Sequence, residues 1–155
     1  MPLELIAAAA FGLILGSFLN ALLYRYNTGR SIAHGRSKCM HCGHTLSAAD
    51  LVPLLSYLFL RGKCRYCSSR ISWQYPLVEA VAAGVAVLLY MQNPEPLSFA
   101  LGLGIFLTLL FVVVYDVRHQ IIPWGALGVL AALVLIKLFL EGAPASAFIA
   151  GPALA

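Results

Sequence analysis

The four cysteines form two C-x-x-C pairs, "CMHC" at residues 39–42 and "CRYC" at residues 64–67. Two such pairs are typical of a tetrahedral zinc site, in which each pair forms a knuckle and the deprotonated sulfurs bind the ion. The predicted zinc ligands are Cys39, Cys42, Cys64 and Cys67. Spare ligand candidates nearby are His34, His41 and His44. A closed site of this kind stabilises a loop that has little core of its own.

The same cysteines also allow a second interpretation, in which they form two disulfides, or one disulfide and a redox-active pair. Stable disulfides are rare in a reducing cytoplasm. The choice therefore depends on which side of a membrane the cysteines occupy, and the basic residues around them favour the cytoplasm and zinc.

A second candidate for chemistry is Asp116, in the stretch "VYDVRHQIIPW" between two apolar runs. A carboxylate is costly there unless it is hydrated, paired or functional. It could simply end a helix and pair with Arg118 or His119. It could instead act as a general acid or base at a membrane interface. Aspartic proteolysis needs two adjacent carboxylates that share a proton, and Asp116 supplies one of them.

The elements that must position these residues are membrane helices. Hydrophobic residues make up 61% of the chain and charged residues 10%, against about a quarter charged in an ordinary soluble domain. A helix needs about 20 apolar residues to cross a lipid bilayer. Four predicted spans cover residues 3–24, 76–91, 97–115 and 121–140, and a partial fifth apolar segment ends in "FIAGPALA".

The expected fold is therefore an all-α polytopic membrane helix bundle with a zinc-binding tetracysteine loop. We divide the chain into a first helix at residues 1–24, the tetracysteine loop at residues 25–75, and the remaining helices at residues 76–155. The apolar stretch "ADLVPLLSYLFLRG" within the loop is too short to span a bilayer. We expect it to lie at the interface or to pack on the bundle.

The basic residues set the expected orientation. Most of them lie in the tetracysteine loop, and Arg118 lies in the turn after Asp116. By the positive-inside rule both segments face the cytoplasm and the N-terminus lies outside. The net charge of +4 then reflects membrane topology, so nucleic acid is not an expected partner. Glu79 is expected within the first turn of the second span, where the helix dipole favours a carboxylate. It has two open interpretations: it caps the helix, or it belongs to a functional site.

Three stretches closely resemble the type IV prepilin peptidases, which are membrane aspartic proteases. These stretches are "GSFLNALLYR" at residues 16–25, the cysteine-containing segment at residues 36–80 that includes "DLVPLLSYL" and "GKCRYC", and "YDVRHQIIPW" at residues 115–124. They occur in the family's order and cover essentially the whole chain.

The resemblance implies a bifunctional enzyme of the inner membrane. Such enzymes cut the leader of a type IV prepilin or pseudopilin after a glycine at the cytoplasmic face. They then methylate the new N-terminus with S-adenosylmethionine. In the family, the aspartate at the place of Asp116 is one of two catalytic carboxylates, the four cysteines bind zinc, and the cysteine loop belongs to the part associated with methyl transfer.

The chain departs from the family pattern in one respect. The second catalytic aspartate of the family lies in a later G-x-G-D motif, which this sequence lacks. Together with the end in "FIAGPALA", this predicts a truncated chain without peptidase activity of its own. No glycine-rich cofactor loop independently indicates a site for S-adenosylmethionine. Two alternatives therefore remain: a catalytically inactive zinc-loop assembly factor, and a quinone-linked thiol oxidoreductase with reactive cysteines at the outer face.

Overall fold

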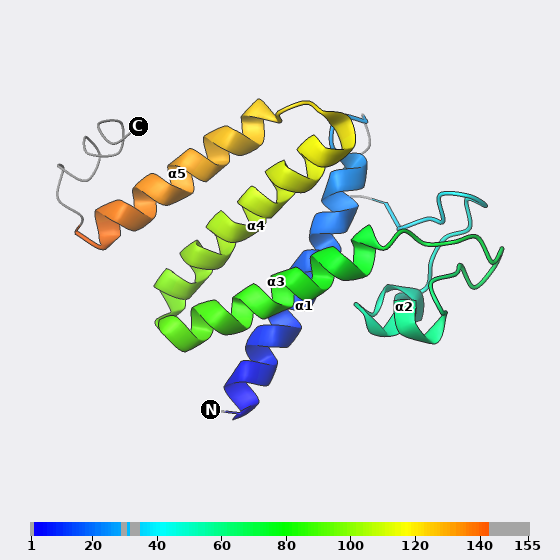
Figure 1. Cartoon of the computed structure of the whole chain (residues 1–155), viewed down its shortest axis with the longest axis horizontal. Helices are drawn as coiled ribbons and strands as arrows, with labels where there is room; N and C mark the ends of the chain where they lie inside the picture. The colour runs from blue at the N-terminus through cyan, green and yellow to red at the C-terminus, as the bar shows by residue number, and fades with distance from the viewer. Residues whose placement is uncertain (1, 29–30, 32–34, 143–155) are drawn as a thin grey trace.

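The computed structural model describes residues 2–28, 31 and 35–142 and confirms an all-helical fold (Figure 1). Its elements in chain order are α1 (Pro2–Arg25), the short 3-10 helix η1 (Ala48–Leu51), α2 (Leu55–Phe59), α3 (Gln74–Gln92), α4 (Pro96–His119) and α5 (Trp124–Leu140). Within the described ranges no β-strand forms, apart from two isolated bridges in the tetracysteine loop. The loop and α2 lie beside the start of α3, at one end of the long helices; we call this the loop end.

Three helices are long and apolar enough to cross a membrane: α1, α3 and α4. Most of their apolar surface is exposed, with side chains such as Ile14, Leu88 and Val113 uncovered. A lipid bilayer accommodates this surface, whereas water does not. The protein is therefore a membrane protein.

The predicted fourth span at residues 121–140 is shorter in the structure. Pro123 is the N-cap of α5, and the helix begins at Trp124 and has 17 residues. This length corresponds to about 26 Å, slightly less than the ~30 Å hydrocarbon core. Proline fixes φ and disfavours helical geometry in the residue before it, which explains why Ile121 and Ile122 stay outside the helix. The predicted fifth segment lies outside the described residues.

α1 and α3 pack closely in antiparallel directions along a seam of small residues. A Cβ atom added at Gly12 would lie 2.6 Å from the Ala82 carbonyl oxygen, and one added at Gly16 would lie 2.8 Å from the Cα atom of Glu79. Glycine and alanine at these positions let the two backbones approach, as is common between membrane helices. The seam fixes where α1 and α3 side chains can meet at the loop end.

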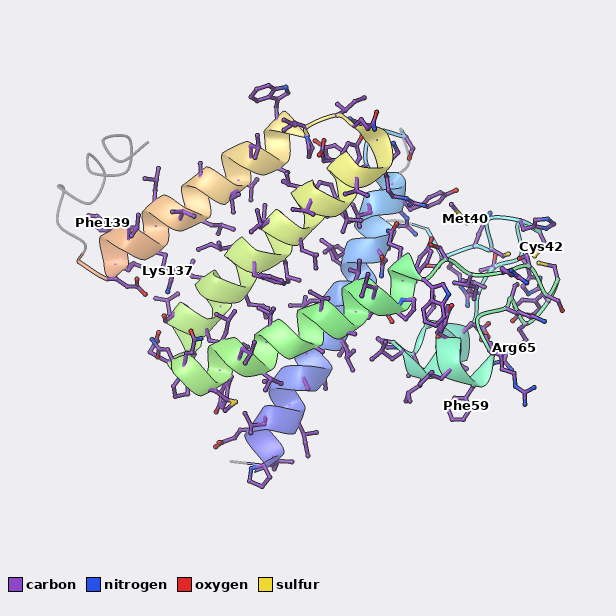
Figure 2. The ribbon with its side chains drawn as sticks, viewed as in Figure 1. Met40, Cys42, Phe59, Arg65, Lys137 and Phe139 are labelled. Carbon is purple, nitrogen blue, oxygen red and sulfur yellow. The ribbon has the colours of Figure 1, made fainter. Side chains whose placement is uncertain are left out.

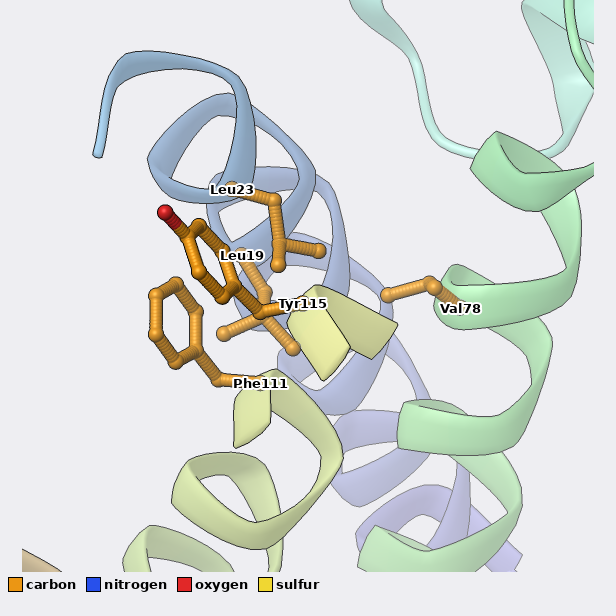
Figure 3. Close-up of a cluster of buried hydrophobic side chains, with 5 residues drawn as sticks. All are labelled: Leu19, Leu23, Val78, Phe111 and Tyr115. Atoms are coloured by element: carbon orange, nitrogen blue, oxygen red, sulfur yellow. The ribbon is translucent and has the colours of Figure 1, made fainter. Parts of the chain in front are cut away.

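A compact apolar cluster joins α4 to this pair near the loop end (Figure 3). Its buried members are Leu19, Leu23, Val78, Phe111 and Tyr115. The Tyr26 ring, just beyond α1, packs edge-on against Phe111 and Tyr115 with centroid distances of 5.2 Å to each. The end of α4 is thereby held beside the end of α1.

The opposite end of the helices carries a separate polar group. Glu95 caps α4 by accepting hydrogen bonds from the backbone N–H groups of Leu97 and Ser98. Lys137 of α5 pairs with Glu141 at 2.5 Å and donates to the Ser98 hydroxyl at 3.2 Å. Figure 2 shows Lys137 on this side of the molecule, far from the tetracysteine loop. The tetracysteine loop and the turn containing Arg118 share the loop end, since both line one cavity there.

Candidate functional site

The first C-x-x-C pair forms a tight knuckle. The backbone N–H of Cys39 donates to the His44 carbonyl at 2.9 Å, and that of Gly43 donates to the Cys39 carbonyl at 3.0 Å. Gly43 adopts a positive φ of 72°, which glycine tolerates without a Cβ clash. This turn brings the Cys42 sulfur to the same side as that of Cys39.

The second pair repeats this geometry. The N–H of Cys64 donates to the Ser69 carbonyl at 2.8 Å, and that of Ser68 donates to the Cys64 carbonyl at 2.9 Å. Ser68 occupies the position equivalent to the glycine of the first knuckle and also has a positive φ, 58°. The two knuckles are therefore structural duplicates, although only one carries glycine at the turn.

The two knuckles bring the four predicted ligands together into a group that could hold a metal ion. All four sulfurs lie within 4.8 Å of one another, and the Sγ atoms of Cys39 and Cys67 are 3.8 Å apart. A zinc ion bound at about 2.3 Å by a regular tetrahedron of thiolates places the sulfurs about 3.8 Å apart, so the arrangement fits zinc. The cysteines are free thiols. Hydrogen bonds from the backbone N–H groups of Cys42 and His41 lower the pKa of the Cys39 thiol to about 6, which favours the thiolate.

The spare histidine candidates do not join this group in the described part of the chain. His44 instead stacks on Tyr66, with ring centroids 3.7 Å apart, and His41 lies in the first knuckle outside the ligand group. His34 lies outside the described residues.

Asp50 links η1 to the second knuckle. Its carboxylate accepts hydrogen bonds from the Ser47 N–H at 3.0 Å and hydroxyl at 2.8 Å, from Arg65 Nε at 2.6 Å and from the Tyr66 hydroxyl at 3.1 Å. Burial alone would raise the pKa of Asp50, but these donors hold it well below its ordinary value. Asp50 is therefore a structural clamp of the loop.

A cavity of about 1040 Å³ lies between the tetracysteine loop and the helix ends. Its floor carries polar residues of the α1–α3 seam, Ser17 and Asn20 from α1 and Tyr75 and Glu79 from α3. Basic side chains also line it: Arg25, Arg36, Lys38, Arg70 and Arg118. Acceptors of the α1–α3 seam and basic side chains therefore line the same cavity.

Two successive polar contacts connect α1 and α3 at this floor. Asn20 Nδ2 donates to the Tyr75 carbonyl at 3.0 Å. One helical turn deeper, the Ser17 hydroxyl hydrogen-bonds to Glu79. The other Glu79 partner is the backbone N–H of Leu54, which donates to Oε2 at 2.8 Å from the tetracysteine loop.

This placement bears on the two interpretations of Glu79. α3 begins at Gln74, so Glu79 lies in the second turn, and the expectation that it lies in the first turn was wrong. It does not cap its own helix. Instead it holds Leu54, whose φ of 58° is unusual for a residue with a side chain. Glu79 therefore belongs to the floor of the cavity.

Asp116 lies in an open position. It occupies the last turn of α4 with its side chain exposed, and its carbonyl accepts the N–H of Gln120 as the helix ends. Among the described residues its carboxylate has no hydrogen bond or ion pair. No second carboxylate contacts Asp116 within residues 2–28, 31 and 35–142.

Sequence reasoning found the cysteines but missed the cavity. Asn20 and Ser17 are small polar residues of a membrane helix, a type that is typical of helix packing and does not by itself indicate a ligand site. Glu79 drew attention as an acid near the start of a span. What the sequence could not indicate is that Tyr75 and the loop arginines surround the same space, because this depends on how the loop folds back.

Comparisons with known proteins agree on one family. Residues 10–93 match the bacterial peptidase A24 N-terminal domain. The chain is 32% identical to a "Prepilin leader peptidase/N-methyltransferase" of Dichelobacter nodosus over 96% of this chain and 63% of the relative. Proteins of the same name from Bacillus subtilis and Vibrio cholerae are 38% and 35% identical over 73% and 77% of this chain and 46% and 50% of their own lengths. No solved structure matches the chain.

Proposed function

Because the chain belongs to the type IV prepilin peptidase family, we propose that it takes part in removing leader peptides from type IV prepilins or pseudopilins and in methylating the new N-terminus. The chain spans about half to two thirds of the length of the relatives compared above. Its residues 10–93 contain the whole α1–α3 seam and the tetracysteine loop. The methyl-transfer part of the reaction is therefore the part to which this chain contributes most.

The observation that carries this proposal is the cavity that the tetracysteine loop and the helix ends form together. A loop of this length with little apolar core needs an internal fastening, and four thiolates around zinc provide one. All four positions of a tetrahedral ion would be taken by sulfur, which leaves none for substrate. Zinc thus holds the loop over the helix ends, and the chemistry takes place in the space that it closes.

S-adenosylmethionine is the methyl donor implied by the methyltransferase name of the relatives, and when bound it supplies an activated methyl group on a sulfonium sulfur. The cavity is large enough for this group. Ligand cavities commonly measure about 300–1,000 Å³, and the arginines of the lining match a carboxylate. Arg36, Arg70 and Arg118 are the residues that we expect to hold it.

For leader cleavage we propose Asp116 as one of two catalytic carboxylates. Its exposure at the loop end places it where an extended peptide can reach it from the membrane surface. One carboxylate cannot both activate water and protonate the carbonyl. We therefore expect these 155 residues alone to leave a synthetic prepilin uncut, and leader removal that is lost in Asp116→Asn would contradict this.

The proposed methyl transfer is tested with protein reconstituted in lipid nanodiscs, a leader-free pilin peptide and S-adenosylmethionine with a tritiated methyl group. We expect label to enter the peptide, and Cys42→Ser to abolish incorporation by releasing zinc. Lys63→Ser, an exposed change directly before Cys64 and outside the residues that line the cavity, is the matched control and should retain activity. A zinc-loaded wild-type protein that transfers no label would overturn the proposal and favour a catalytically inactive zinc-loop assembly factor.

We also propose that the tetracysteine loop faces the cytoplasm of the inner membrane, with the N-terminus outside. The exposed Cys42 sulfur offers a direct test. A membrane-impermeant thiol reagent should label zinc-depleted protein in opened vesicles but not in intact cells. Labelling from outside would reverse the topology and favour thiol oxidoreductase chemistry at the outer face.

A further inference from the structure

The floor of the cavity contains an acceptor without a donor. Asn20 is 3% exposed, and its Oδ1 atom has no hydrogen-bond partner within the described residues, although its Nδ2 is bonded to Tyr75. Nearly all buried polar atoms in proteins are hydrogen-bonded, since desolvation without a partner costs free energy. Asn20 also lines the cavity, so a molecule bound there can supply the missing donor.

A carboxylate without a counter-ion lies beside it. Glu79 is 7% exposed, and in the described part of the chain it forms no ion pair. Its known donors are the neutral Leu54 N–H and the Ser17 hydroxyl. Buried carboxylates in membrane helices are usually paired with a cation. Glu79 is close to Asn20, because Asn20 contacts Tyr75 and Tyr75 lies one helical turn from Glu79.

These groups match a primary ammonium better than a metal ion. An ammonium has three N–H donors, and the floor offers oxygen acceptors from Glu79, Asn20 and Ser17. Hard divalent cations need six or more oxygen ligands. In the described residues, the only grouping suited to a metal is the set of four cysteines.

The cavity is also larger than one ammonium group requires. Its volume of about 1040 Å³ extends from the floor past basic side chains to the tetracysteine loop. A ligand with a positive end at Glu79 and polar or negative groups farther along fits this distribution of charge. The N-terminal residues of a polypeptide have this character, with one α-ammonium followed by carbonyl oxygens.

We propose that Glu79, Asn20 and Ser17 form a binding site for the α-ammonium group of a polypeptide N-terminus. Glu79 supplies the counter-charge and the Asn20 oxygen accepts one N–H. This inference rests on the proposed function, in which a new N-terminus is the methyl acceptor, and it adds the residues that hold that terminus. Because Leu54 donates to the same carboxylate, the site is complete only when the tetracysteine loop is folded.

The experiment measures binding rather than methyl transfer. Zinc-loaded protein in phosphatidylcholine nanodiscs, which contain no primary amine, is titrated with a hexapeptide that has a free N-terminus and a C-terminal fluorophore. The matched peptide carries a hydroxyl group in place of the α-amino group. We expect fluorescence anisotropy to show binding of the first peptide and at least about thirtyfold weaker binding of the second, as for the loss of one member of a buried charge pair.

Glu79→Gln separates recognition from folding. Glutamine keeps an acceptor for the Leu54 N–H but removes the charge, so zinc content should stay unchanged while the free-amino peptide loses at least about thirtyfold in affinity. Glu95→Gln, at the opposite end of the helices, is the control and should bind as wild type. If Glu79→Gln does not retain zinc, Asn20→Leu, expected to weaken binding about tenfold, takes its place.

Several results would overturn the inference. These are equal affinity for the two peptides, no binding by the wild type, or unchanged affinity in Glu79→Gln. Loss of peptide binding when phosphatidylethanolamine replaces phosphatidylcholine would assign the site to a lipid ammonium instead. Peptide binding with no methyl transfer would contradict the proposed function alone, and methyl transfer without dependence on Glu79 would contradict the inference alone.

Discussion

The loop end contains two acidic regions that differ in how they are built. Glu79 is covered, is held by donors from α1 and from the tetracysteine loop, and lines a cavity. Asp116 is exposed at the end of α4, and within the residues described its carboxylate contacts no polar partner. Buried polar groups require an organised surrounding, whereas exposed groups do not. The described chain therefore organises the surroundings of Glu79, whereas Asp116, which we propose as one member of a peptidase pair, is left without polar contacts in that part of the chain.

Removal of zinc should have the largest effect on the region around Glu79, and it should leave the region around Asp116 unchanged. Cys39→Ser or a strong chelator should unfold the tetracysteine loop, because structural zinc contributes about 10–16 kcal/mol to folding of small zinc-dependent units. The proposed methyl transfer, measured by label incorporation, should then be lost while α1, α3 and α4 remain helical, as measured by metal analysis and circular dichroism. Loss of the helical signal together with zinc would show that the two regions fold as one unit.

A smaller loss of folding stability should follow when the seam between α1 and α3 is widened beneath the cavity. Gly16→Ala places a Cβ atom 2.8 Å from the Glu79 Cα, so α1 and α3 must separate, at a cost of about 1–3 kcal/mol. Thermal unfolding in nanodiscs measures this change. Gly84→Ala is the matched control because a Cβ there meets nothing within 4 Å. It should be neutral or stabilising by up to ~1 kcal/mol, and equal losses in both variants would refute close packing at the seam.

Loss of the Asp50 clamp should reduce the stability of the tetracysteine loop by a comparable or smaller amount. Asp50→Asn keeps the size of the side chain but removes the charge that Arg65 and Ser47 stabilise. It should cost about 1–2 kcal/mol of loop stability, seen as faster zinc release to a competing chelator at neutral pH. The low pKa of Asp50 gives the sign of its pH dependence: its contribution is full above the ordinary carboxyl pKa and falls as the pH drops below it. Unchanged zinc release in Asp50→Asn would exclude the clamp.

Substitution of Asp116 should have the smallest effect on folding stability. Because its side chain is exposed and without a polar partner in the part of the chain that is described, Asp116→Asn should change the free energy of unfolding by less than about 0.5 kcal/mol. Zinc content should also be unchanged. A loss greater than about 1 kcal/mol would indicate that Asp116 is structurally embedded, and the contrast with Glu79 would then be wrong.

The sequence predicted the apolar helices and indicated the two cysteine knuckles, because both depend on local pattern. Apolar runs set α1, α3 and α4, and C-x-x-C spacing is sufficient to form a knuckle. It failed at two helix boundaries and where distant contacts decide. The end of α5 nearest the loop moved to Trp124 because of Pro123, and Glu79 was assigned to the wrong turn because α3 begins earlier than its apolar residues do. The cavity could not be predicted, since Asn20, Glu79 and Leu54 meet only after the loop folds back.

The two knuckles together reduce the conformational freedom of the connection between α1 and α3. A zinc ion shared by Cys39, Cys42, Cys64 and Cys67 would act as a four-way cross-link and would divide the long connection between α1 and α3 into shorter closed loops. Shorter loops lose less entropy when their ends are fixed. The ordering of Leu54 against Glu79 is therefore cheap while the cross-link exists and costly without it. Without zinc, the membrane helices would still form. The cavity, in contrast, would form only in molecules that have bound zinc.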